Sequence, residues 1–273
     1  MPTRPARNIL ESLQDTILLE GALAADALGH GLTSFRRYSF ADKGSFYGAM
    51  FSTSIGLERA LKLVAVFDHA LTNNTLMSDD KLKKIGHNIQ DLLSHSRTVR
   101  TRHSLSVDDT VLSDKVIINA ITEIHNFAQH SRYYNLDTLS RGAAKRGSIE
   151  PLASWDANVC VPILQRHHRV TSKQRESSAM AEKMSAGFVV FHTRENGTEV
   201  RNMQDLVCES NKVESKQKWS TFYVLRLIEY CVEVLSALDH RLRTPTYIGE
   251  YFAIFHTLDR QASLRRKRWF PLR

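Results

Sequence analysis

The feature that most constrains the fold of this chain is a long stretch of apolar residues with helical spacing, at residues 46–74. Its apolar side chains recur at steps of three and four residues, so they lie on one face of a helix. This face carries Phe46, Met50, Leu57, Leu61, Val64 and Leu71. A long amphipathic helix is stable when its apolar face is covered, and we therefore expect several helices packed around this one.

Other stretches have the same periodicity and predict the helices that cover this face. They lie at residues 8–30, 78–94, 108–130 and 218–242. Gly29 and Gly31 are expected to end the first of these helices, and Gly86 interrupts the second. A polar and basic segment that starts at Ser96 predicts a loop before the helix at residues 108–130.

Residues 187–203 differ from the rest of the chain because they predict a short β-hairpin. Their valines and phenylalanine favour a strand, and Asn196-Gly197 is a typical turn dipeptide. The predicted fold class is therefore all-α: an antiparallel helical bundle with an elaborated C-terminal half that contains this hairpin. Residues 1–138 are expected to form the helical domain, and residues 139–273 a helical extension that packs on the same bundle and ends in a basic tail.

The charge of the chain favours anionic partners. The formal net charge is +8 and the pI is near 9.5, and a positive surface attracts RNA, DNA, nucleotides or acidic proteins. The clearest local excess is the C-terminal tail, which contains Arg265, Arg266, Lys267, Arg268 and Trp269. Cations beside an aromatic ring are suited to RNA, through phosphate contacts and base stacking. The alternative is a tail that is simply solvated.

No metal ion or cofactor is predicted. A second basic segment contains Arg166, His167, His168 and Arg169, but adjacent histidines on a helix point about 100° apart and rarely bind one metal ion together. A solvated basic face is the simpler interpretation. The sequence has no Gly-rich phosphate loop, no zinc helix with two histidines and a glutamate, and no Gly-x-Ser-x-Gly elbow.

The cysteines and the apolar runs indicate where the protein is expected to reside. Cys160, Cys208 and Cys231 are too widely separated for a disulfide framework or a structural zinc site, which favours a reducing compartment. The N-terminal residues turn acidic before any apolar stretch long enough for a signal peptide, and no run of about 18 apolar residues occurs. We therefore expect a cytoplasmic protein that does not span a membrane.

Three short motifs occur in order in the first half of the chain: Gly-Leu-Glu-Arg at residues 56–59, Gly-His-Asn at residues 86–88 and Ser-Arg-Tyr-Tyr at residues 131–134. In order and spacing they resemble the HEPN superfamily of RNA-targeting and nucleotide-associated domains. The resemblance covers residues 45–137, about a third of the chain. It implies a helical bundle that forms a homodimer, acts on RNA or a nucleotide, and has an antitoxin or regulatory protein as a partner in a prokaryotic defence or toxin system.

Two of these motifs supply candidate site residues, each with two interpretations. His87 either fixes the start of a helix by bonding a nearby carbonyl or carboxylate, or acts as a phosphate contact or an acid-base group. Arg132, followed by Tyr133 and Tyr134, is suited to hold a phosphate beside a stacked base. The same group also suits a buried ion pair with a carboxylate at a helix end.

The helix at residues 46–74 carries two further polar pairs. Glu58 and Lys62 are four residues apart, so they support the helix from its solvated face. The alternative is that Glu58 or Arg59 faces a groove shared with a second subunit. Near the end of the helix, Asp68 and His69 are either polar capping groups or catalytic residues.

Members of the superfamily that cut RNA carry an arginine followed a few residues later by a histidine, and Arg97 and His103 match this pattern. The resemblance implies metal-independent cleavage, in which the 2′-hydroxyl of the RNA attacks, the histidine moves a proton and the arginine stabilises the phosphorane. With His87 and Arg132, these residues make up the predicted catalytic set of an endoribonuclease.

The position of this pair leaves a second function open. In the nucleases the pair lies at the start of a late bundle helix, whereas here Arg97 and His103 are predicted to lie in a polar loop. That difference favours a non-catalytic module, which binds RNA or a nucleotide, dimerises and regulates a partner.

Overall fold

The computed structural model describes residues 7–143, 149–185, 188–242, 246–256 and 259–270. Regular structure within these ranges is almost entirely helical, which confirms the all-α fold class. The central bundle contains α2 (Gln14–Phe35), α3 (Lys43–Asn73), α5 (Ile89–Arg102), α6 (Lys115–Asn126) and α11 (Met203–Asp239). Shorter helices surround it: α1 (Arg7–Glu11), α4 (Asp79–Ile85), α7 (Tyr134–Arg141), α8 (Pro151–Trp155), α9 (Val161–His167), α10 (Ser172–Met184) and α12 (Arg260–Arg265).

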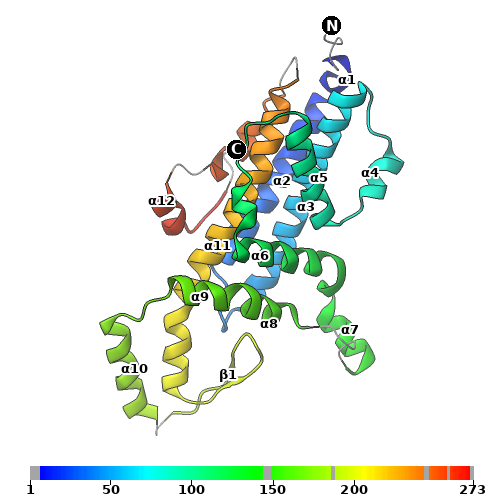
Figure 1. Cartoon of the computed structure of the whole chain (residues 1–273). Helices are drawn as coiled ribbons and strands as arrows, with labels where there is room; N and C mark the ends of the chain where they lie inside the picture. Colours follow the sequence, from blue (N-terminus) through cyan, green and yellow to red (C-terminus); the bar gives the residue numbers. More distant parts are fainter. Residues whose placement is uncertain (1–6, 144–148, 186–187, 243–245, 257–258, 271–273) are drawn as a thin grey trace.

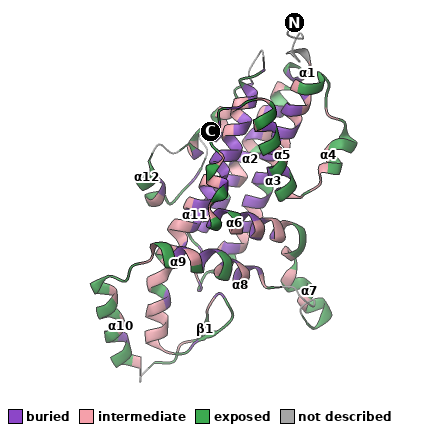
Figure 2. Ribbon diagram, viewed as in Figure 1, coloured by how far each residue is buried: buried purple, intermediate pink, exposed green. Residues whose placement is uncertain are grey.

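Helices α2, α3 and α11 lie side by side along the long axis of the molecule, and α5 and α6 pack against them (Figure 1). The residues that face one another across these helices are buried (Figure 2). Helices α4, α7 and α10 lie outside this core and are largely exposed (Figure 2). The core therefore combines α2 and α3 from the first half of the chain with α11 from the second half.

The prediction that Gly29 and Gly31 end the first helix is wrong, because α2 continues through both glycines to Phe35. Gly31 instead faces α3: a Cβ atom there would lie 2.2 Å from Oγ1 of Thr53 and 2.9 Å from the Thr53 backbone nitrogen. A Cβ atom on Gly56 of α3 would in turn lie 2.6 Å from Cγ of Leu28. These glycines let the two helices approach more closely than a side chain would allow.

Gly86 separates α4 from α5, as predicted, with a φ of +64°. Asn88 then caps α5 by accepting a hydrogen bond from the backbone nitrogen of Asp91. The predicted loop from Ser96 onward is wrong in its first part, because α5 continues to Arg102. Ser96 and Val99 are buried and continue the apolar face of α5, so packing on the bundle keeps this polar segment helical.

The helix predicted at residues 108–130 is divided into three parts. A 3₁₀ turn at Thr110–Ser113 precedes α6, and a π-helical turn at Phe127–Ser131 follows it. Asp114 caps α6 by accepting from the backbone nitrogen of Val116. The apolar face of α6 is buried, as its sequence predicts.

Helix α11 is longer than predicted. It begins at Met203, capped by Asn202, and its first turns extend beyond the bundle to pack against α10 and the hairpin (Figure 1). Acidic and basic side chains recur along much of its 37 residues. Among the described helices, none is both long enough and apolar enough to cross a membrane.

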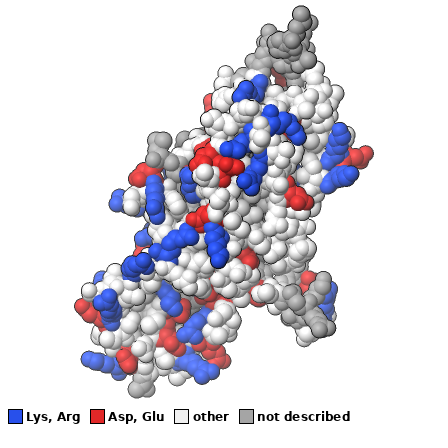
Figure 3. Space-filling model, in the orientation of Figure 1, with Lys and Arg blue, Asp and Glu red and all other residues white. Residues whose placement is uncertain are grey.

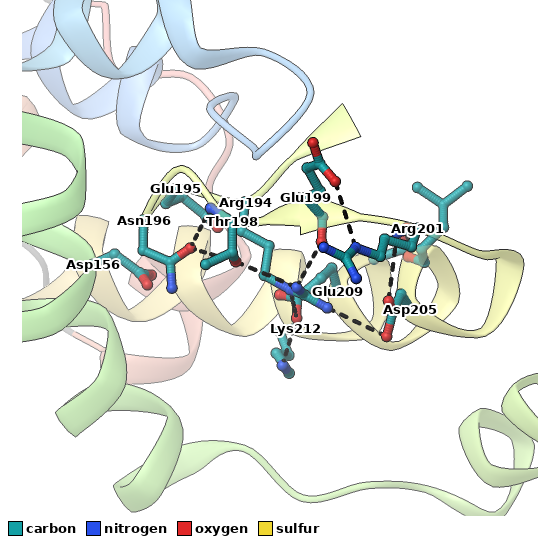
Figure 4. Close-up of polar contacts among 12 residues, drawn as sticks. Asp156, Arg194, Glu195, Asn196, Thr198, Glu199, Arg201, Asp205, Glu209 and Lys212 are labelled. Atoms are coloured by element: carbon teal, nitrogen blue, oxygen red, sulfur yellow. Dashed lines mark hydrogen bonds and ion pairs between the residues drawn. The ribbon is translucent and has the colours of Figure 1, made fainter. Parts of the chain in front are cut away.

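The predicted hairpin is present but very short. Strand β1 (His192–Thr193) pairs antiparallel with β2 (Glu199–Val200), and Gly197 in the turn has a φ of +80°. Arg194 ties the hairpin to α11, with Nε 3.0 Å from Glu209 and Nη2 3.3 Å from Asp205 (Figure 4). Ion pairs hold this hairpin in place because it has few apolar side chains inside the core.

Lys216 of α11 makes the most deeply buried ion pairs near the hairpin. Its Nζ lies 2.7 Å from Asp156, in the π-helical turn after α8 (η3, Asp156–Cys160), and 2.8 Å from Glu195 of the hairpin turn. Its ammonium therefore joins three separate segments of the chain.

We predict that Gly31→Ala lowers the free energy of unfolding by about 1 to 3 kcal/mol, since the added methyl group forces α2 and α3 apart. Urea unfolding followed by circular dichroism measures this. The control is Gly48→Ala, whose Cβ would meet only Oγ of Ser34, at 3.9 Å. It should leave stability unchanged or raise it by up to about 1 kcal/mol. Equal stability of the two variants would contradict the proposed close approach.

We also predict that Lys216→Ala lowers the free energy of unfolding by about 3 to 5 kcal/mol, because two carboxylates then lose a buried partner. Lys218→Ala is the matched control, because Lys218 pairs with Glu214 near the surface. This substitution should cost less than about 1 kcal/mol. The same urea titration measures both, and a Lys216 variant as stable as the control would show that the buried pairs contribute little.

Candidate functional site

His87 contacts the Gly-Leu-Glu-Arg motif of α3. Its Nδ1 lies 2.8 Å from Oε1 of Glu58, which also accepts from Nζ of Lys62 at 2.8 Å. The first two motifs of the resemblance therefore meet in the structure. Glu58 is largely covered, whereas the ring of His87 is mostly exposed, so this pair fixes the start of α5 while leaving an imidazole edge at the surface.

Arg132 lies just after the π-helical turn, with its guanidinium carbon 5.3 Å from the centre of the Phe51 ring on α3. The two tyrosines that follow have different surroundings. Tyr133 is 60% exposed, whereas Tyr134 lines a cavity of about 550 Å³ together with Ser131 and residues of α6, α7 and α8. Tyr133 is thus accessible for stacking, and Tyr134 faces the cavity.

The structure does not bring Arg97 and His103 together. Arg97 is exposed on α5, with Nη2 3.4 Å from Asp109, whereas His103 follows the last turn of α5 and contacts Asp68 of α3. Arg102, rather than Arg97, is the arginine beside His103.

The four predicted catalytic residues are also spread along the molecule. Apart from Arg97, they contact α3 at Phe51, Glu58 and Asp68. With a rise of 1.5 Å per residue, these positions are separated by about 10 Å and about 15 Å along the helix axis. Arg132, His87 and His103 therefore do not line one cleft.

Asp68 gathers three basic side chains at one end of α3. Both of its carboxylate oxygens accept from Nη1 of Arg102, at 2.9 and 2.7 Å. Nε2 of His103 lies 2.8 Å from Oδ1, and Nε2 of His95 lies 3.4 Å from Oδ2. We call Asp68, His95, Arg102 and His103 the Asp68 cluster.

The Asp68 cluster combines a buried carboxylate with accessible basic groups. The side chain of Asp68 is 6% exposed and that of His103 is 17% exposed. The side chains of His95 and Arg102 are 37% and 43% exposed. Burial by itself raises the pKa of Asp68, but hydrogen bonds from His95, His103 and Arg102 outweigh it and hold the pKa well below its usual range. Asp68 is therefore an anion that orients its three neighbours.

The hydrogen bond to Asp68 determines which nitrogen of His103 carries a proton. A carboxylate only accepts, so Nε2 of the imidazole donates and Nδ1 is left as the accepting nitrogen of the neutral ring. An imidazole held in this way can accept a proton from a hydroxyl group. The guanidinium of Arg102 beside it can stabilise an anion.

His95 and Arg102 are the members of this cluster that were not predicted from the sequence. They are seven residues apart, so both lie on the same side of α5. This signal depends on the segment being helical, and the polar composition from Ser96 onward predicts a loop instead. His69, the neighbour of Asp68, bonds Asn73 and Thr75 and acts as a group at the end of α3.

The C-terminal tail is anchored by Trp269. This residue is fully buried, and its backbone nitrogen donates to Oγ1 of Thr33 at 2.9 Å. The prediction that Trp269 stacks on a base therefore disagrees with its position, because packing against the bundle covers the indole. The cations Arg265, Arg266, Lys267 and Arg268 are exposed, although Arg266 also lies over the Trp269 ring, 4.9 Å from its centre.

No family model, curated protein or solved structure matches this chain. In the described ranges, no group of three or more histidine, cysteine, aspartate or glutamate side chains is arranged to hold a metal ion. Cys160, Cys208 and Cys231 are free thiols. The Asp68 cluster is thus defined by its geometry alone, as a site made of imidazole and guanidinium groups.

We predict that Asp68→Asn lowers the free energy of unfolding at pH 7 by about 1.5 to 3 kcal/mol, because charged hydrogen bonds are lost. The pKa of Asp68 is depressed in the folded protein, so its contribution is complete above the unfolded value of about 3.9 and declines as the pH falls below it. Urea unfolding between about pH 5 and 3 should show the gap between wild type and variant narrowing. A constant gap would contradict this role.

Proposed function

We propose that this chain is an RNA-directed protein similar to HEPN domains, and that it cleaves RNA without a metal ion at the Asp68 cluster. The observation that supports this proposal is the set of two imidazoles and one guanidinium around a buried carboxylate, at a partly exposed end of α5. These are the groups that cleavage through the 2′-hydroxyl of RNA requires.

Each group in the cluster has a place in this reaction. Nδ1 of His103 accepts the proton of the 2′-hydroxyl, which attacks the adjacent phosphorus. His95 donates a proton to the departing 5′-oxygen, and Arg102 stabilises the negative charge on the phosphorane. The products are a 2′,3′-cyclic phosphate and a free 5′-hydroxyl, and the side chains of the cluster supply both proton transfers. Asp68 holds the groups in position and does not touch the RNA.

A second candidate function is RNA or nucleotide binding without cleavage. It is favoured by the carboxylate partners of the predicted residues, since His87 pairs with Glu58, Arg97 with Asp109 and His103 with Asp68. In such a module these groups hold α5 in place, and the net charge of +8 attracts the nucleic acid.

The wider context also remains a proposal, drawn from the sequence resemblance. It comprises a homodimer, a cytoplasmic location and a regulatory or antitoxin partner in a defence or toxin system. Size measurement of the purified protein tests the first of these directly.

We predict that the purified protein cuts total RNA in the presence of a chelator, and that His103→Ala and His95→Ala each slow cleavage by about 10²- to 10⁴-fold. Arg102→Ala should slow it by about 10²- to 10³-fold, since it removes one group that stabilises the developing charge. Gel analysis of end-labelled RNA, with identification of the cyclic phosphate, measures this.

The matched controls are His87→Ala and Arg97→Ala, which change exposed side chains outside the Asp68 cluster. Both should retain wild-type activity within a few fold. Intact RNA under every condition would leave RNA binding as the remaining function. Equal cleavage by all variants would overturn the assignment of catalysis to the Asp68 cluster. Circular dichroism of each variant separates loss of activity from loss of folding.

A further inference from the structure

Side chains from α9, α11 and α12 form a stack at the surface. The imidazole of His167 lies parallel to the indole of Trp219, with ring centroids 3.4 Å apart and an angle of 8° between the planes. The guanidinium carbon of Arg260 lies 4.9 Å from the centre of the same indole. Since His167 covers one face at van der Waals distance, Arg260 lies over the other face. Trp219 is half-buried, and Arg260 is exposed.

The position of His167 is fixed by polar contacts at the ring edge. Nη1 of Arg166 donates to Oδ2 of Asp114 at 2.7 Å and to the hydroxyl of Tyr223 at 2.8 Å. The Tyr223 hydroxyl also forms a hydrogen bond with Nε2 of His167, again at 2.8 Å. Burial and the nearby Arg166 and Arg260 lower the pKa of His167 to about 4, so its ring is neutral at pH 7. The indole therefore rests on a rigid, uncharged support.

The surroundings of this stack are basic. Figure 3 shows lysine and arginine side chains over α9, the adjoining part of α11 and α12. Arg166 and Arg169 are exposed on the α9 side, and Arg260 and Arg265 are exposed on α12. A flat aromatic ring among exposed guanidinium groups is the combination that binds the backbone and bases of a single strand.

We propose that this surface, the Trp219 site, binds single-stranded RNA. One base stacks on the indole face that Arg260 now covers, and Arg260 turns outward to a phosphate. This exchange is favourable because a base stacks on an aromatic ring more strongly than an exposed cation does. A duplex is excluded, since its bases already stack on one another. An acidic peptide would be attracted by the positive charge, but its carboxylates do not stack on the indole face.

The inference rests on the proposed function, because it assigns the RNA strand a second contact apart from the Asp68 cluster. Arg241, just after α11, donates to the backbone oxygen of Ser104, beside His103. Trp219 lies about 20 residues earlier on the same helix, so the two sites are roughly 30 Å apart along α11. A strand that reaches both must be long, and short oligonucleotides should bind the Trp219 site alone.

The intrinsic fluorescence of the protein tests the proposal directly. The chain has three tryptophans, and Trp155 and Trp269 are fully buried, so Trp219 is the one that an RNA base can quench. We predict that 2′-O-methyl oligouridine, which cannot be cleaved through its 2′-oxygen, quenches the emission of the wild-type protein. Trp219→Leu should remove the quenching and weaken binding, measured by fluorescence anisotropy, by about 5- to 150-fold.

Charge variants separate this site from a general attraction to anions. Arg169→Glu should weaken binding and reduce its dependence on salt, because one phosphate contact is lost. Lys81→Glu on α4 makes the same charge change at an exposed position elsewhere and should have a smaller effect. Unchanged emission in the wild type, or equal quenching by duplex RNA or polyglutamate, would overturn the proposal.

The outcomes also distinguish this inference from the proposed function. If RNA is never cut but oligouridine quenches Trp219, the nuclease proposal fails and the binding site stands. If His103→Ala abolishes cleavage but Trp219→Leu binds RNA like the wild type, the binding site fails and the nuclease stands. Thermal unfolding of Trp219→Leu shows whether the variant is folded, and the quenching of the wild type does not depend on any variant.

Discussion

The close contact between α2 and α3 is the constraint on which the rest of the structure depends. Gly31 and Gly56 lack the side chains that would separate these helices, and Thr53 and Leu28 occupy the space. With α2 on one side, α3 presents its remaining faces to α5, α6 and α11. Helix α3 thereby holds His87, His103 and Arg132 in place, because each of them contacts a side chain of this helix.

Charged groups inside this framework mark where separate segments join. Asp68 fastens the end of α5 to α3, and Lys216 fastens the hairpin and the turn after α8 to α11. In both cases several partners surround one buried charge, because an unpaired charge would be costly to remove from water. The two groups differ in access. The partners of Asp68 are partly exposed, whereas Lys216 and its partners Asp156 and Glu195 are mostly buried, so the Asp68 cluster is the candidate for chemistry.

Much of the helical framework was predictable, since a long apolar stripe leaves few alternatives. The helix at residues 46–74 and the turn at Asn196-Gly197 are where the sequence predicts them. Two of the errors have a common cause, which is that burial outweighed local preference. Gly31 does not break α2 because it packs on α3, and the segment after Ser96 stays helical because Val99 enters the core.

The sequence by itself determined the all-α class, the positive charge and the residue types from which any site must be built, because periodicity and composition are properties of the chain. Tertiary structure alone decided which of those residues meet. The packing of the helices placed Arg102 and His95, rather than Arg97, around Asp68 together with His103. It also buried Trp269 and stacked His167 on Trp219. The physical reason is that each of these contacts joins segments whose distance depends on how the helices pack, and helical spacing within one segment carries no information about that distance.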